Sequence, residues 1–140
     1  MKPLVLSDIQ AHWANLEFNL HFRNNVTLIM GNSGTGKTIL YRAINTYARN
    51  NNNNNIICLD RNSEAYIDTI LNNGTGRFIL IDNADTLLLM RQRAQLAMDP
   101  HNQYVIITHC VNGYMCNENS LAELKIENNI GKLIYPFIEE

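Results

Sequence analysis

The stretch that decides the fold is VTLIMGNSGTGKTILYRAINTYAR, residues 26–49. It opens with the short apolar run 26–30, which is typical of a buried strand. A glycine-rich segment follows, and 38–49 then has the spacing of an amphipathic helix. The apolar residues that share one face of this helix are Ile39, Leu40, Ala43, Ile44 and Tyr47. A buried strand that turns through glycines into such a helix predicts an α/β domain.

The rest of the chain repeats this alternation of apolar runs and helical patterns. Strands are predicted at 4–9, 16–22, 56–60, 77–82 and 104–110, and helices at 63–73 and 86–98. A short helix around 118–123 precedes a β-hairpin with strands 123–128 and 132–137, joined by the turn 129–131. We therefore expect one domain, 1–140, with a three-layer parallel sheet, an N-terminal strand pair and a C-terminal hairpin.

The segment GNSGTGKT, residues 31–38, fits the pattern Gly-x-x-x-x-Gly-Lys-Thr between a strand and a helix. Such a loop points backbone N–H groups at a phosphate, and the helix N-terminus adds its positive dipole end. Lys37 is expected to reach the β- and γ-phosphates, and the Thr38 hydroxyl to ligate Mg²⁺. The predicted nucleotide-binding residues are Gly31, Asn32, Ser33, Gly34, Thr35, Gly36, Lys37 and Thr38. The alternative is a glycine-rich turn that binds nothing.

A second acidic position follows the apolar run 78–81. Asp82 would lie at the carboxyl end of its strand, which is where ligands bind in open α/β sheets. It is expected to hold Mg²⁺ opposite Thr38. The alternative for Asp82 is an aspartate that ends a strand and starts a turn.

The two motifs have a whole strand between them, at 56–60, and the strand after Asp82 ends in Thr108 and His109. In these features the chain resembles the P-loop NTPase division that contains the ABC, SMC, AAA and RecA-like ATPases. The resemblance covers about residues 26–110. It implies ATP as the nucleotide, with Mg²⁺ beside it.

The likeness is strongest to the ABC and SMC ATPases. IDNAD (81–85) is similar to their DEAD or DEP strings, and VIITHC (105–110) resembles their switch-histidine motif. This implies that His109 lies near the γ-phosphate, whereas the AAA likeness implies Thr108 or His109 as a polar sensor. Trp13 lies about where ABC ATPases carry an aromatic residue that stacks on adenine. A buried core tryptophan is the alternative.

The chain departs from these families in two ways. The short segment 61–76 leaves no room for the helical insert with the ABC signature motif, and no AAA lid follows, so the chain resembles a stripped ATPase core. Asn83 stands where the family has a glutamate that polarises water, so general-base assistance worth about 10²–10⁴ in rate is missing. Asp85 is the candidate replacement, and an N-cap role for it is the alternative. Arg91 and Arg93 fit either an arginine finger across a dimer or a solvated helix face.

The bulk composition limits the partners. A net charge of −2 gives no global attraction to nucleic acid or anionic lipid. No apolar run approaches the ~18 residues of a membrane span. The three cysteines have no metal-like spacing, and we see no targeting segment, so we expect a cytoplasmic protein.

The expected function is a Mg²⁺-dependent ATP-binding P-loop NTPase, a slow ATPase that couples nucleotide state to a conformational change. Its catalytic residues would be Lys37, Asp82, Asp85 and His109. The alternative is an ATP-gated switch that binds a protein partner of unknown identity with little or no hydrolysis, as a phage or mobile element would encode. A nucleotide or small-molecule kinase ranks last, because no arginine-bearing lid follows the third strand. The sequence leaves open whether the chain forms a homo-oligomer.

Overall fold

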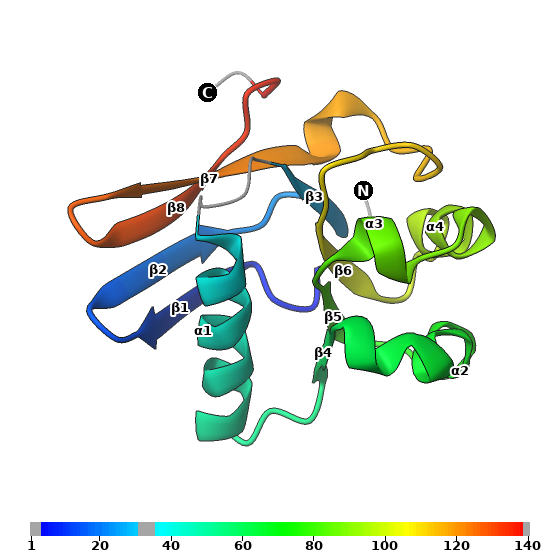
Figure 1. Cartoon of the computed structure of the whole chain (residues 1–140), viewed down its shortest axis with the longest axis horizontal. Helices are drawn as coiled ribbons and strands as arrows, with labels where there is room; N and C mark the ends of the chain where they lie inside the picture. The colour runs from blue at the N-terminus through cyan, green and yellow to red at the C-terminus, as the bar shows by residue number, and fades with distance from the viewer. Residues whose placement is uncertain (1–3, 31–35, 139–140) are drawn as a thin grey trace.

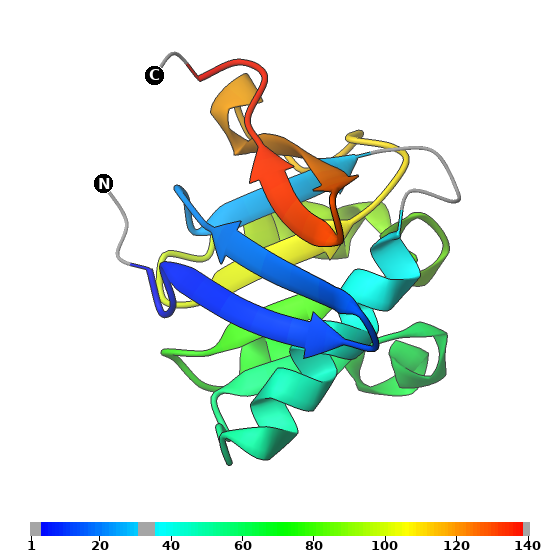
Figure 2. The same ribbon diagram turned by 90° about the vertical axis from the view of Figure 1, so that its left-hand side faces the viewer.

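The computed structural model describes residues 4–30 and 36–138, which form one eight-stranded mixed sheet and four α-helices (Figures 1 and 2). The first half contains β1 (Asp8–Trp13), β2 (Leu16–His21), β3 (Val26–Met30), α1 (Lys37–Asn50), β4 (Ile56–Leu59), a 3₁₀ helix η1 (Arg61–Tyr66) and α2 (Ile67–Asn72). The second half contains β5 (Phe78–Ile81), α3 (Ala84–Leu87), α4 (Met90–Ala97), β6 (Gln103–Ile107), a 3₁₀ helix η2 (Glu118–Ser120), β7 (Leu121–Glu127) and β8 (Ile130–Ile134).

The strands follow the order β1-β2-β8-β7-β3-β6-β5-β4. Neighbours from β7 to β4 are all parallel, whereas the hairpins β1–β2 and β7–β8 are antiparallel. The predicted α/β class is confirmed, but the sheet is mixed and is not the three-layer parallel sheet that was predicted. Strands joined by a short turn pair antiparallel, so each predicted hairpin makes the sheet mixed. The parallel part brings the carboxyl ends of β3, β4, β5 and β6 to one edge.

Two apolar layers cover the parallel strands. Leu40 and Ile44 of α1 pack on one face with Phe22 and Phe78, whose rings meet edge to face at 5.4 Å. The other face is covered by α2, α3 and α4, which Figure 1 shows on the opposite side from α1. The β1–β2 hairpin curls over α1 and shares its apolar layer. Helices therefore pack on both faces of the parallel part of the sheet.

Several element boundaries differ from the prediction, and three of the differences bear on the fold. The first strand begins at Asp8 and not at residue 4, because the backbone N–H groups of Val5 and Leu6 donate to the buried Gln103 side chain at 2.9 and 2.8 Å. The helix predicted over 86–98 is two helices, since Leu88 and Leu89 have extended backbones. The hairpin turn lies at 128–129, where two asparagines adopt the left-handed conformation that asparagine tolerates.

Gly131 lies where β8 meets β2. A Cβ at this position would lie 2.5 Å from Cδ1 of Phe18, a side chain with no exposed surface. We expect Gly131→Ala to lower the free energy of unfolding by about 1–3 kcal/mol, because the packed ring has no space into which to move. Urea denaturation of this variant and of Lys132→Ala, an exposed neighbour on β8, measures the effect. Equal unfolding midpoints for the two variants would contradict the prediction.

Candidate functional site

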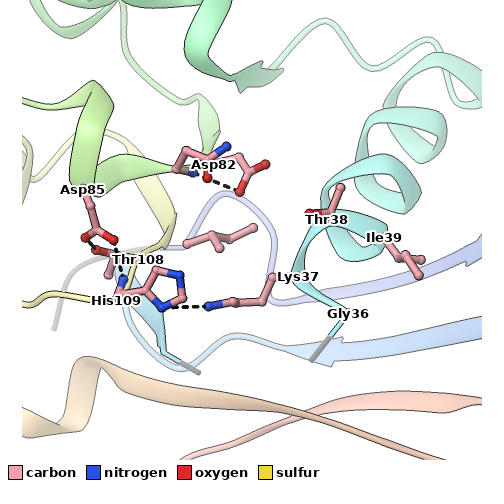
Figure 3. A pocket seen from close by; sticks show the side chains of 10 residues that line it. Gly36, Lys37, Thr38, Ile39, Asp82, Asp85, Thr108 and His109 are labelled. Carbon is pink, nitrogen blue, oxygen red and sulfur yellow. Dashed lines mark hydrogen bonds between the residues drawn. The ribbon is translucent and has the colours of Figure 1, made fainter. Parts of the chain in front are cut away.

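A cavity of about 350 Å³ lies at the carboxyl edge of the sheet, beside the start of α1 (Figure 3). Its lining is Gly36, Lys37, Thr38, Ile39, Asp82, Asn83, Asp85, Ile107, Thr108 and His109. Because β6 lies between β3 and β5, the end of β6 brings Thr108 and His109 between α1 and the end of β5. The cavity thus brings together Lys37, Thr38, Asp82, Asp85 and His109, which the sequence singled out. The predicted loop residues Gly31, Asn32, Ser33, Gly34 and Thr35 lie outside the described residues.

Lys37 is the first residue of α1, and only 8% of it is exposed. Its Nζ lies 3.4 Å from Nδ1 of His109, whose side chain is open to solvent (Figure 3). Burial lowers the pKa of Lys37, while the carboxylates of Asp85 and Asp82 act in the opposite direction. The cavity therefore presents a largely buried amine next to an accessible imidazole.

Gly36 leads into Lys37 with a positive φ of 91°. A Cβ here would lie 2.6 Å from Cδ1 of Ile126 on β7. A side chain at residue 36 is thus opposed both by the backbone conformation and by the neighbouring strand. The sequence motif has glycine at position 36. The close approach of Ile126 to this position is evident only from the structure.

Asp82 follows β5 and is buried. Burial raises its pKa, and the hydrogen bond that its Oδ1 accepts from the Asn83 N–H at 2.9 Å offsets only part of this effect. A buried carboxylate in this state favours a nearby cation. Asn83 itself has φ 53° and ψ 42°, a left-handed conformation that asparagine adopts more readily than glutamate.

The Thr38 hydroxyl and the Asp82 carboxylate line the same cavity. Across residues 4–30 and 36–138, no three or more His, Cys, Asp or Glu side chains gather to hold a metal ion. Mg²⁺ that accompanies a nucleotide needs only one or two protein ligands, because phosphate oxygens and water complete its shell. Thr38 and Asp82 therefore fit a nucleotide-bound Mg²⁺ and do not form a metal site by themselves.

Asp85 ties the start of α3 to the segment after β6. Its carboxylate accepts hydrogen bonds from the Thr108 hydroxyl and from the backbone N–H groups of His109 and Cys110, the latter two at 2.9 and 3.1 Å. Burial raises the pKa of Asp85, but these hydrogen bonds outweigh it and hold the pKa below its usual value. The predicted N-cap role is wrong, because α3 begins at Ala84 and Asn83 occupies the cap position. A carboxylate held in this way is a weak base, and its contacts position His109.

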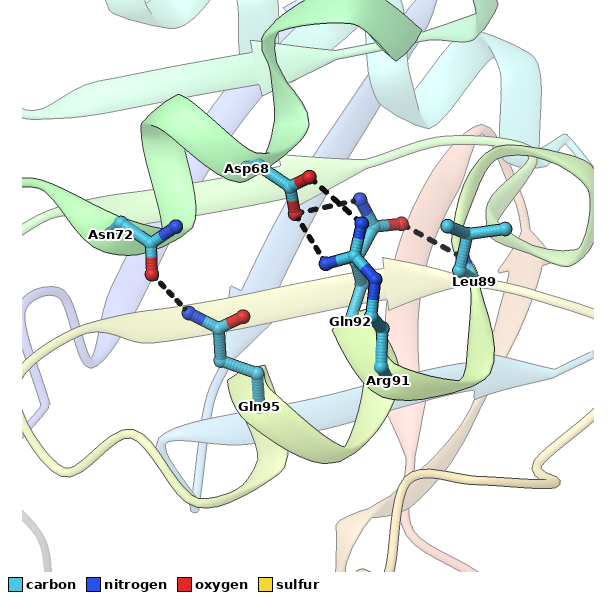
Figure 4. Close-up of polar contacts among 6 residues, drawn as sticks. All are labelled: Asp68, Asn72, Leu89, Arg91, Gln92 and Gln95. Carbon is cyan, nitrogen blue, oxygen red and sulfur yellow. Dashed lines mark hydrogen bonds and ion pairs between the residues drawn. The ribbon is translucent and has the colours of Figure 1, made fainter.

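Both arginines of α4 make contacts within their own chain. Arg91 pairs bidentately with Asp68 of α2, at 2.8 and 2.9 Å, and Gln95 donates to Asn72 beside it (Figure 4). The prediction of a solvated face is wrong for Arg93, of which only 6% is exposed. No periodicity in the sequence distinguishes the buried arginine from the exposed one.

Trp13 ends β1 and is 37% exposed, so the prediction of a buried core tryptophan is wrong. The guanidinium of Arg42 lies 5.9 Å from the centre of its indole ring. Arg42 is on the same helix as Lys37, about a turn and a half further along. One face of the indole ring is therefore turned toward Arg42 of α1, and part of the Trp13 surface remains open to a ligand.

No protein-family model matches this chain, and no curated protein is significantly similar to it. Among the helices within the described ranges, none is both long and apolar enough to cross a membrane. The three cysteines, Cys58, Cys110 and Cys116, are free thiols, and burial raises the pKa of Cys58 to about 12. The function is therefore inferred from the cavity and from the residues that line it.

Proposed function

We propose that this protein binds ATP as a P-loop NTPase of the division that contains the ABC, SMC, AAA and RecA-like ATPases. One observation carries the proposal. Lys37 of the glycine-rich motif, Asp82 after β5 and His109 after β6 line one cavity. A glycine-rich turn without a ligand gives no reason for these three side chains to converge.

The sheet gives further support to the family proposal. The order β3-β6-β5-β4 sets a parallel strand between the strand before the phosphate motif and the strand before Asp82. The strand between the two motifs along the sequence, predicted at 56–60, is β4 at the edge of the sheet, so the strand that lies between the two motifs in space is β6. The antiparallel hairpins extend this parallel core at one side only, so they leave the carboxyl edge of β3, β6 and β5 unchanged.

The residues of the cavity suit a triphosphate. The Lys37 ammonium would donate to the β- and γ-phosphate oxygens, and the N-terminal dipole of α1 would add to that attraction. His109 would lie next to the γ-phosphate, because its ring already contacts the Lys37 amine. Thr38 and Asp82 would hold Mg²⁺, which supplies charge neutralisation to the phosphates when it is bound.

We propose slow hydrolysis as the activity, because binding and electrostatic stabilisation remain while the base is missing. Within the described part of the cavity the carboxylates are Asp82 and Asp85, and Asp85 is already held by three donors. This observation favours the second candidate, an ATP-gated protein-binding switch that retains its nucleotide. Both candidates require the same ATP site and differ only in how long the triphosphate persists.

The single tryptophan of the chain reports on the proposed site. We expect Mg·ATP to change the fluorescence of Trp13, because the exposed indole lies beside the helix that would carry the phosphates. Stacking on a base is worth about 1–3 kcal/mol, so Trp13→Leu is expected to weaken ATP binding by roughly 5- to 150-fold. Calorimetric titration with Mg·ATP and with Mg·GTP measures the affinity of each variant and the base preference.

Tyr66→Leu is the matched control for the loss of an exposed aromatic side chain, because Tyr66 lies on η1, which contacts α2 and α3. It should bind ATP as the wild-type protein does. If Trp13→Leu bound ATP with unchanged affinity, Trp13 would not contact the base. The proposed contacts of the phosphates with the cavity would still stand. Absence of binding to every nucleoside triphosphate would overturn the proposed function.

A further inference from the structure

A chain of hydrogen bonds runs from the phosphate cavity to the surface of the molecule. It begins where Lys37 Nζ meets His109 Nδ1 at 3.4 Å. The backbone N–H of His109 donates to Asp85 Oδ2 at 2.9 Å, and the backbone carbonyl of Asp85 accepts from Arg93 Nη2 at 3.0 Å. Arg93 Nη1 also donates to the carbonyl of Asn112 at 3.1 Å. Arg93 therefore ties the segment 108–115, which we call the sensor loop, to helices α3 and α4.

Arg93 is a charged residue that is almost completely buried, and its burial costs free energy of hydration. A guanidinium removed from water loses several kcal/mol of hydration unless close partners replace it. Two backbone carbonyls and the face of Tyr114, 5.6 Å from Arg93 Cζ, supply part of that replacement. Its Nε has no hydrogen-bond partner among the described residues. A methionine or leucine would fill the space at lower cost, so the contacts of Arg93 indicate a coupling role.

The surface end of this series of contacts comprises Leu88 and Leu89, which separate α3 from α4, and Met90, the first residue of α4; we call residues 88–90 the elbow. Leu89 and Met90 are 57% and 56% exposed, although both are apolar. The elbow and the sensor loop are in direct contact, since a Cβ on Gly113 would lie 2.7 Å from the sulfur of Met90. Beyond the elbow, α4 is held to α2 by the Arg91–Asp68 pair and the Gln95–Asn72 hydrogen bond (Figure 4).

In this arrangement the elbow is the segment that can move when a phosphate binds in the cavity. A γ-phosphate that accepts hydrogen bonds from Lys37 Nζ would compete with His109 Nδ1 for this donor, so the Lys37–His109 contact would differ between the phosphate-bound and phosphate-free states. Any resulting shift of His109 acts on Asp85 through its backbone N–H, and on Arg93 through the Asp85 carbonyl. Since α4 is held to α2, the displacement is taken up at the elbow.

We propose that phosphate occupancy of the cavity is transmitted through Asp85 and Arg93 to the elbow, and regulates the exposure of Leu89 and Met90. This inference rests on the proposed nucleotide site and names the segment that the site controls. Asp85 and Arg93 are positioning residues in this scheme, because they act through His109 and the sensor loop. The ligand shifts the elbow only by as much as it binds the two arrangements with different affinity.

Hydrogen–deuterium exchange of the full chain, with and without a Mg²⁺-bound, non-hydrolysable ATP analogue, tests the proposal. In the wild-type protein, the analogue is expected to change exchange at least threefold both in the sensor loop and at 88–93. In Arg93→Gln, the analogue should bind within about threefold of wild type and still change exchange at 108–110. The change at 88–93 should be lost. Arg49→Gln is the control, since Arg49 is an exposed arginine in the last turn of α1, outside this series of contacts, and it should keep the change.

The outcomes separate the two proposals. An analogue that binds by calorimetry but leaves 88–93 unchanged in the wild-type protein overturns the coupling and leaves the nucleotide site intact. The same holds if Arg93→Gln keeps the full wild-type response. If no analogue or nucleotide binds, the proposed function fails and the coupling fails with it. Should Arg93→Gln not fold, Arg93→Lys keeps the charge but not the fork that joins two carbonyls, and it should also lose the response.

Discussion

Lys37→Ala is expected to remove most of the stabilisation that Mg·ATP gives the wild-type protein. A hydrogen bond to a charged group contributes about 1.5–3 kcal/mol, so loss of the ammonium should weaken ATP binding by roughly 10- to 150-fold. At a hundred times the wild-type Kd, ATP stabilises a binder by about 2.7 kcal/mol. A variant with a hundredfold weaker Kd would gain only about 0.4 kcal/mol at the same concentration. Thermal melts with and without Mg·ATP measure both quantities.

The variant should fold, because burial already disfavours the charged form of Lys37 and its removal relieves that cost. Lys125→Ala is the control, since Lys125 lies on β7 outside the cavity lining and is exposed. It is expected to keep the full response to ATP. If Lys37→Ala were stabilised by ATP as much as the wild-type protein, the phosphates would have to bind elsewhere, and the assignment of the cavity would be wrong.

The parts of the fold that local pattern determines were predictable. The strand predicted at 26–30 matches β3, and the helix predicted at 38–49 differs from α1 by one residue at each end. Both have a clear hydrophobic period, and the glycine motif separates them. The convergence of Lys37, Asp82 and His109 was also predictable, because parallel strands bring their carboxyl ends to one edge.

The contacts that join distant segments were not predictable from the sequence. Asp85 stands one turn after a strand, a position that suits an N-cap equally well, and only the fold shows that it holds the segment after β6. The run of apolar residues 87–90 fits a continuous helix, yet the backbone extends at Leu88 and Leu89. The parallel pairing of β2 with β8 depends on Gly131 fitting against Phe18, a contact with no local signal.

Asn83→Glu is expected to raise the rate of ATP hydrolysis by about 100-fold or more, because a carboxylate in the cavity restores a general base worth 10²–10⁴. Asn83 lines the cavity, and its backbone N–H donates a hydrogen bond to Asp82 Oδ1. This contact holds the backbone of residue 83 in place, so a longer side chain there would start from the cavity wall. The left-handed backbone, with φ 53°, opposes glutamate. The variant should therefore be less stable than the wild-type protein by about 1 kcal/mol. Single-turnover phosphate release and urea denaturation measure the two effects.

Asn83→Gln separates the chemistry from the strain. Glutamine has the shape of glutamate and the same cost in the left-handed conformation, but its amide accepts no proton. It should lose the same stability as Asn83→Glu and gain no hydrolysis. Faster hydrolysis in Asn83→Glu alone would mean that the asparagine keeps an otherwise competent site slow, as a switch that retains its triphosphate requires. Equal rates of ATP hydrolysis in the two variants would show that a side chain at residue 83 does not reach the attacking water. The absence of a glutamate at this position would then not explain slow hydrolysis.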